Sequence, residues 1–288
     1  MAKFIQYSTK ESQYNGPFDS KVGWAAAGMG DLLVSTNGKL VVVDGGCPND
    51  AEDFVELLEK NADGKPVVEL WIITHPHGDH YGAINAISKN PELASKIEVK
   101  KFMYWFPMEF CNKEGVSGIL EYGNKDMEAI AAVFGAEIEQ PYRDQQIVID
   151  DLTLDFLYVP DDCSILNTAG GNSNHCSLIF TVQGPEKKAI ITGDAYGRSM
   201  QVTAWRYYHN LKCDIMQFPH HALCDSFCAD FYRYIDAKIV FLPISIAGYR
   251  AMHSNMYANG TGGTINLVAE AKADEVYKAF EGTFEVEI

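Results

Sequence analysis

The sequence predicts an α/β fold with two β-rich halves, each interleaved with helices. Short runs rich in Val, Ile and Leu recur along the chain, and stretches with apolar residues at helical spacing lie between them. The 288 residues are 47% hydrophobic and 22% charged, as in ordinary globular proteins. No linker-like break divides the chain, so we expect a single domain over residues 1–288.

A β-hairpin is the clearest single element. The β-rich runs 31–36 and 39–44 flank Asn37-Gly38, a dipeptide that tolerates the positive φ values of a type I′ turn. Asp44 ends the second run and Gly45-Gly46 follows it, so the chain turns sharply beside a carboxylate.

Apolar periodicity predicts the other elements. Strands are expected at residues 67–74, 101–106, 146–150, 152–159, 177–182, 188–192, 214–218, 238–242 and 283–288. Helices are expected around residues 54–58, 81–88, 127–134, 198–209, 227–234 and 267–280. The stretch 161–174 has little apolar sequence, which predicts a long loop over a site.

The charge balance limits the partners. Lys and Arg number 23 against 39 Asp and Glu, a formal net charge of −16, so the protein's own field repels nucleic acid and anionic membranes at long range. We therefore expect a small-molecule substrate rather than long nucleic acid. No apolar stretch is long enough to span a membrane, and the start of the chain lacks a secretory signal. Together with seven scattered cysteines, these features predict a cytoplasmic protein with reduced thiols.

The strongest functional signal is Thr74-His75-Pro76-His77-Gly78-Asp79-His80, between an expected strand and an expected helix. Imidazole nitrogens suit zinc and neighbouring transition metals, and a carboxylate oxygen can serve a second ion, so one loop offers ligands to two metals. Further candidates lie at other strand ends or starts: His175, Asp194 and the pair His220-His221.

These motifs resemble the metallo-β-lactamase-fold hydrolases over roughly residues 28–255. Asp44, the His75–His80 motif, a histidine before a strand, Gly193-Asp194 and His220 occur in that family's order. Within the superfamily, four segments are most similar to the hydrolase domain of the bacterial competence DNA-uptake channel, without its membrane helices: residues 28–31, 174–180, 191–195 and 219–221. The resemblance implies a four-layer αββα sandwich with a dinuclear metal site along one edge of the two sheets.

The resemblance also implies a ligand set. The first metal is expected on His75, His77 and His175. The second is expected on Asp79, His80 and His220, and Asp194 is expected to bridge both ions. Asp44 is expected to hydrogen-bond a metal-bound histidine and fix its tautomer, although a simple turn residue is an equally good interpretation.

Two ligand assignments have alternatives. Relatives of the competence hydrolase often carry Asn near the position of His175, so Asn172 or Asn174 could replace it. His221 is the alternative to His220, which we prefer for its position in the family pattern.

We expect a metal-dependent hydrolase in which water held by two divalent ions attacks a small phosphodiester, phosphate ester or cyclic ester. Zinc is the first choice for this nitrogen and oxygen shell, with manganese or iron as alternatives. Asp79 and Asp194 are expected to orient the water, and His253 to contact a phosphate or donate a proton to the leaving group, although an exposed surface histidine is nearly as good an interpretation. The competing functions are a non-catalytic metal-binding module and a di-iron oxidoreductase of the same fold, a class that usually has Glu where this chain has His77.

Overall fold

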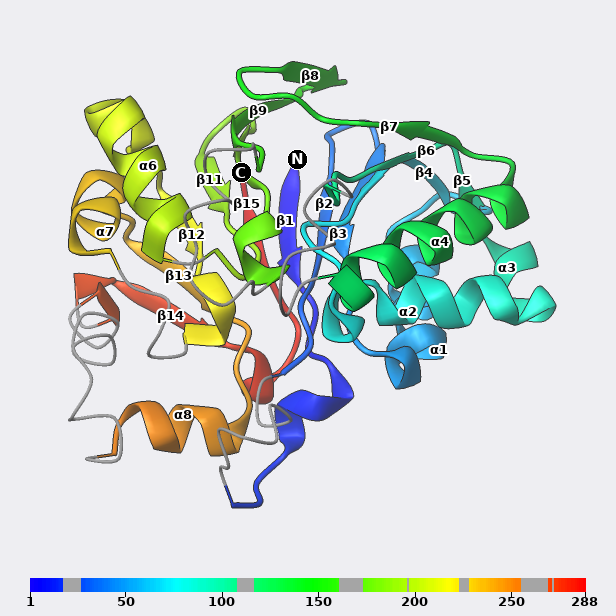
Figure 1. The fold of residues 1–288 in the computed structure, drawn as a ribbon, viewed down its shortest axis with the longest axis horizontal. Coiled ribbons are helices and arrows are strands. Elements are labelled where there is room, and N and C mark those ends of the chain that lie inside the picture. Colours follow the sequence, from blue (N-terminus) through cyan, green and yellow to red (C-terminus); the bar gives the residue numbers. More distant parts are fainter. Residues whose placement is uncertain are drawn as a thin grey trace.

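Two β-sheets lie face to face, with helices on both outer sides, as Figure 1 shows. This is the αββα sandwich expected from the sequence. The computed structural model describes residues 1–17, 27–107, 117–160, 173–195, 197–222, 228–254, 269–270 and 272–288.

The first sheet comes mainly from the N-terminal half of the chain. Its strands are β1 (Lys3–Gln6), β2 (Gly30–Val34), β3 (Leu40–Asp44), β4 (Val67–Ile72), β5 (Glu98–Val99), β6 (Lys101–Met103), β7 (Glu137–Glu139) and β15 (Phe284–Glu287). Their order is β15-β1-β2-β3-β4-β6-β7, and β5 pairs with β4. The pairs from β15 to β3 are antiparallel, and those from β3 to β7 are parallel.

The second sheet comes from the C-terminal half. Its strands are β8 (Gln146–Ile149), β9 (Leu152–Tyr158), β10 (Ile179–Gln183), β11 (Lys188–Ile191), β12 (Ile215–Gln217), β13 (Ile239–Leu242) and β14 (Glu275–Lys278). Their order is β14-β13-β12-β11-β10-β9-β8. The pairs from β11 to β14 are parallel, so these strands end at one edge of the sheet.

Helices cover the outer face of each sheet (Figure 1). On the first sheet lie α1 (Ala51–Lys60), α2 (Gly78–Lys89), α3 (Pro91–Lys96) and α4 (Ser117–Phe134). On the second lie α6 (Gly197–Tyr207) and α7 (Ala229–Ile235), and α8 (Ile246–Met252) follows β13. The 3-10 turns are η1 (Lys10–Gln13), η2 (Pro48–Asp50), η4 (Ser173–Cys176), η5 (Tyr208–Leu211), η6 (Pro219–Ala222) and η7 (Ala279–Glu281).

Apolar side chains form three separate layers. One layer, with Trp71 and Phe54, lies between the first sheet and its helices. The second, with Phe4 and Phe241 in edge-to-face contact, lies between the two sheets. The third, with Phe231, lies between the second sheet and its helices. Each sheet therefore buries both faces, which fixes the strand ends that carry the polar residues.

The hairpin prediction is confirmed, and one helix prediction is wrong. Strands β2 and β3 pair with Val34 opposite Leu40. The turn is not the expected type I′, because Gly38 has a φ of +80° but Asn37 has no positive φ. Residues 275–278, expected within a helix, form strand β14 beside β13. There Val276 and Tyr277 face different apolar layers, so burial on both sides of the sheet overrides the helical spacing.

The expected loop 161–174 lies outside the described residues except for its last two, which begin η4. Among the helices of the described residues, none has the length and apolar character of a membrane span.

Candidate metal centre

The loop between β4 and α2 carries half of the candidate site. His75 and His77 lie in the loop, and α2 begins at Gly78, earlier than the sequence predicts. Asp79 and His80 are therefore in the first turn of the helix, where a carboxylate is favoured by the helix dipole.

Two turns at the end of the second sheet supply the facing side chains. Asp194 follows β11, and Gly193 before it has a φ of +51°. A Cβ at Gly193 would lie 2.7 Å from the Thr74 side chain, so only glycine allows the two loops to approach this closely. His220 and His221 follow β12 in η6, and both also have positive φ values.

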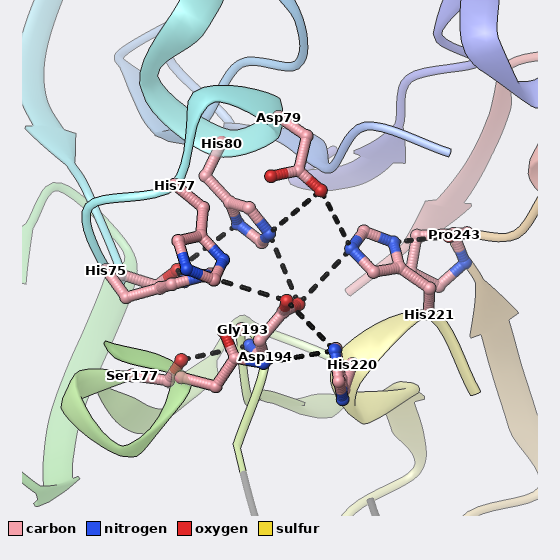
Figure 2. Close-up of polar contacts among 12 residues, drawn as sticks. His75, His77, Asp79, His80, Ser177, Gly193, Asp194, His220, His221 and Pro243 are labelled. Carbon is pink, nitrogen blue, oxygen red and sulfur yellow. Dashed lines mark hydrogen bonds and ion pairs between the residues drawn. The ribbon is translucent and has the colours of Figure 1, made fainter. Parts of the chain in front are cut away.

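Asp194 is at the centre of the cluster (Figure 2). Its Oδ1 lies 3.2 Å from the Nε2 of His80 and 3.4 Å from the Nε2 of His221. Its Oδ2 lies 3.6 Å from the Nε2 of His75 and 3.7 Å from the Nε2 of His220. Four imidazoles thus surround one carboxylate, two at each oxygen.

Asp79 lies on the solvent side of the cluster. Its Oδ2 is 3.3 Å from the Nε2 of His221 and 4.0 Å from that of His80. The Asp79 side chain is 30% exposed, whereas those of His80, His221 and Asp194 are at most 2% exposed. Asp79 is therefore accessible to a molecule that enters the site.

Buried atoms without hydrogen bonds indicate that the cluster holds cations. Within the described part of the chain, the Nε2 atoms of His75, His80 and His221 and the Oδ1 of Asp194 are buried without a hydrogen-bond partner. Leaving one such atom unpaired costs about 1–3 kcal/mol. The ligand atoms form two groups, each within 4.8 Å: His75, His80 and Asp194, and Asp79, His80 and His221. Nitrogen and carboxylate donors at this spacing fit divalent metal ions.

Asp44 supports His80 from behind. Its Oδ2 lies 2.8 Å from the Nδ1 of His80, and its carboxylate also accepts hydrogen bonds from the backbone N–H and hydroxyl of Thr74. The indole N–H of Trp71 donates to the Asp44 backbone carbonyl at 2.6 Å. Because Nδ1 donates to a carboxylate, the Nε2 of neutral His80 can offer its lone pair to a cation beside Asp194. This is the contact with a histidine that the sequence predicts for Asp44.

Two further contacts orient the cluster. The Nδ1 of His221 lies 2.8 Å from the carbonyl oxygen of Pro243, after β13, and the Asp194 backbone N–H donates to the Ser177 hydroxyl at 3.1 Å. The sequence gives no signal for Pro243, because any residue can supply a backbone carbonyl.

The charges in the cluster shift its pKa values. Burial lowers the pKa of His221, but Asp194 and Asp79 outweigh it and raise that pKa to about 10. Burial raises the pKa of Asp194, but His221 and His80 outweigh it and hold that pKa well below its ordinary value. Burial and then His80 lower the pKa of His75 well below its usual range. His75 is therefore neutral and Asp194 ionised, the forms in which both bind metals.

The sequence assigned His220 to the group with Asp79 and His80, and the structure places His221 there instead. His220 lies at the other oxygen of Asp194. The reason is the backbone, because positive φ values at both positions turn the two adjacent side chains in different directions.

The other predicted site residues lie at different distances from the cluster. The ring of His77 is 4.5 Å from that of His75, and its Nε2 is 2.5 Å from the Ser173 hydroxyl. His175, in η4, is in neither group of metal-ligating atoms, and the same holds for His77 and His220. His253 caps α8, and its Nε2 lies 3.0 Å from a carboxylate oxygen of Glu270.

A match to a family model agrees with this geometry. Residues 32–226, more than half of the chain, match the model of the metallo-beta-lactamase superfamily. This chain belongs to the metallo-β-lactamase superfamily. No curated protein matches its sequence.

Solved structures of other proteins share the fold at low identity. The Zn²⁺-bound PqqB from Methylobacterium extorquens has a TM-score of 0.58 and 9% identity over all of both chains. A diphosphatase of the PhnP family has a TM-score of 0.51 and 14% identity over 100% of this chain and 98% of that one. CmlA, a diiron β-hydroxylase from Streptomyces venezuelae, has a TM-score of 0.54 and 8% identity over 99% of this chain and 54% of that one. Such likeness shows the fold, which serves hydrolases and oxidoreductases and holds zinc or iron.

Proposed function

We propose that this protein is a hydrolase that acts with two divalent metal ions, zinc first and manganese or iron as alternatives. The observation that supports this most strongly is the Asp194 carboxylate with two imidazole nitrogens at each oxygen. In this proposal Asp194 would contribute to holding both ions. Asp79, His80 and His221 would hold one of them, and His75 and His77 would contribute to the other.

The side chains of the cluster would orient the reacting water. When bound, two such ions lower the pKa of a shared water to near 7 and place positive charge beside the reacting oxygen. Asp79, whose side chain is 30% exposed, can accept a hydrogen bond from the water. Asp194 is only 2% exposed and is held through its backbone by Ser177, so its two oxygens stay in place during turnover.

The substrate class that we propose is a small phosphodiester, phosphate ester or cyclic ester. The net charge of −16 disfavours long polyanions. The motifs similar to those of the competence hydrolase favour phosphodiester chemistry, and one protein of the same fold is named as a diphosphatase. The seven cysteines are scattered along the chain, and Cys47, Cys213 and Cys228 are free thiols among the described residues, so we propose the cytoplasm as the location.

Turnover by metal-loaded protein tests the proposal. Elemental analysis would be combined with chromogenic phosphodiester, phosphate monoester, lactone, thioester and β-lactam substrates. We expect hydrolysis of at least one phosphate or cyclic ester, and a loss of about 100-fold or more in Asp79→Ala, because a ligand that also orients the water is removed. The matched control is Asp236→Asn, at an exposed position after α7 with a φ of 49° that asparagine tolerates.

The competing functions give different results in the same experiment. Bound metal without turnover of any substrate would support a non-catalytic metal-binding module. Bound iron with oxygen consumption would support a di-iron oxidoreductase. Turnover unchanged in Asp79→Ala would contradict the proposed role of the cluster.

A further inference from the structure

The adjacent residues His220 and His221 have an unusual backbone. Their φ values are 46° and 52°, and Ala222 after them has a φ of 57°. A positive φ is uncommon outside glycine, and each such residue costs on the order of 1–3 kcal/mol, so it persists only where the surrounding structure requires it. Three in succession, shortly after β12, indicate that this turn serves the site rather than the stability of the fold.

The turn sends the two imidazoles to different oxygens of one carboxylate. The Nε2 of His221 lies 3.4 Å from the Oδ1 of Asp194 and 3.3 Å from Asp79. The Nε2 of His220 lies 3.7 Å from the Oδ2 of Asp194, the oxygen that His75 also approaches. Figure 2 shows the two rings reaching Asp194 from separate directions.

We propose that His220 is a ligand of the first metal, so that two consecutive histidines serve two different ions. The inference rests on the proposed dinuclear centre. It gives His220 the ligand role at the first metal that the sequence predicts for His175. His75 and His220 then share the Oδ2 side of Asp194, and His80 and His221 share the Oδ1 side.

Contacts around His220 support this role. Its backbone N–H donates to the carbonyl of Gly193 at 3.1 Å, which ties the turn to the loop that carries Asp194. The side-chain amide nitrogen of Asn174 lies 3.0 Å from the Nε2 of His220. Since that amide can only donate, Nε2 carries a lone pair, which is the form of histidine that binds a metal.

Two neighbouring residues are the alternatives for this ligand position. His175 precedes β10 in η4, and its backbone carbonyl accepts a hydrogen bond from the Tyr158 hydroxyl at 3.3 Å. The side-chain amide of Asn174 reaches His220. Both residues are therefore tested beside His220.

Metal stoichiometry distinguishes these candidates without any substrate. Each protein would be dialysed against buffered free zinc that just saturates the wild type. The variants are His220→Ala, His220→Asn, His221→Ala, Asn174→Ala and His175→Ala, and the control is His209→Ala, at an exposed position in η5. Bound zinc per chain would be measured by elemental analysis, and cobalt absorption spectra would report each site. His220→Asn keeps the fold testable, because asparagine tolerates a positive φ.

We expect two zinc ions per chain in wild type, His175→Ala and His209→Ala, and one in both His220 variants. His221→Ala should also hold one ion, with a cobalt spectrum different from that of the His220 variants because the other site is lost. Two ions in folded His220 variants, with one in His175→Ala or Asn174→Ala, would overturn this assignment while leaving the dinuclear centre intact. A wild type that binds no metal would overturn the assignment and the proposed function together.

Discussion

Replacing Asp44 by asparagine tests how the cluster keeps His80 ready to bind a metal. The Oδ2 of Asp44 lies 2.8 Å from the Nδ1 of His80, and both side chains are fully buried. An asparagine could keep its oxygen toward the Thr74 N–H, which lies 2.8 Å from Oδ1. Its amide nitrogen would then face Nδ1 and donate to it. His80 would have to carry its proton on Nε2, the nitrogen that faces Asp194.

The size of the effect follows from this single change of tautomer. Partners that orient a metal-bound histidine typically change metal affinity by about 10–100-fold. We therefore expect Asp44→Asn to weaken one metal site by about 10–100-fold, or about 1.4–2.7 kcal/mol. Loss of the charged hydrogen bond should also lower the free energy of unfolding of metal-free protein by about 1.5–3 kcal/mol.

Chelator competition would measure the affinity of each site, and guanidinium denaturation would measure the free energy of unfolding. The control is Asp236→Asn, which should change neither metal affinity nor stability by more than about 0.5 kcal/mol. An Asp44→Asn protein that folds and binds both ions as tightly as wild type would refute the tautomer argument.

Three further predictions concern other parts of the structure. Burial, and then Asp44, raise the pKa of Asp31 well above its ordinary value, so this carboxyl contributes stability below about pH 4 and loses it as the pH rises through its folded pKa. Denaturation at several pH values should show the free energy of unfolding of Asp31→Asn rising relative to that of wild type between pH 4 and 8, and a pH-independent difference would contradict this. Trp71→Phe removes the 2.6 Å hydrogen bond to the Asp44 carbonyl and should cost about 1–3 kcal/mol of unfolding free energy; an unchanged denaturation midpoint would show that this bond does not hold the loop. The Nε2 of His253 lies 3.0 Å from a carboxylate oxygen of Glu270 and is therefore engaged away from substrate, so His253→Gln should reduce turnover of the best ester substrate by less than about 10-fold. A loss of about 100-fold or more would favour the proton-donor role predicted from the sequence.

The part of the site that is local in sequence could be predicted. His75, His77, Asp79 and His80 lie within six positions, and their residue types alone indicate metal binding. Asp194 was also predicted, since it follows a β-rich run and a glycine whose positive φ the structure explains by the close approach to Thr74.

The choice between adjacent histidines could not be predicted. Both His220 and His221 follow β12, and only their backbone angles decide which oxygen of Asp194 each one approaches. Residue type does not indicate three successive positive φ values in residues other than glycine. Strand β14 could not be predicted for a similar reason. Its pairing with β13 depends on a partner more than thirty residues earlier in the chain.

Anomalous diffraction from zinc-loaded crystals tests most directly whether the cluster around Asp194 binds two metal ions. We expect two peaks about 3.5–4 Å apart, one beside each oxygen of Asp194. One peak would lie near His80 and His221, and the other near His75 and His220. A single peak, or peaks bound away from Asp194, would contradict the account.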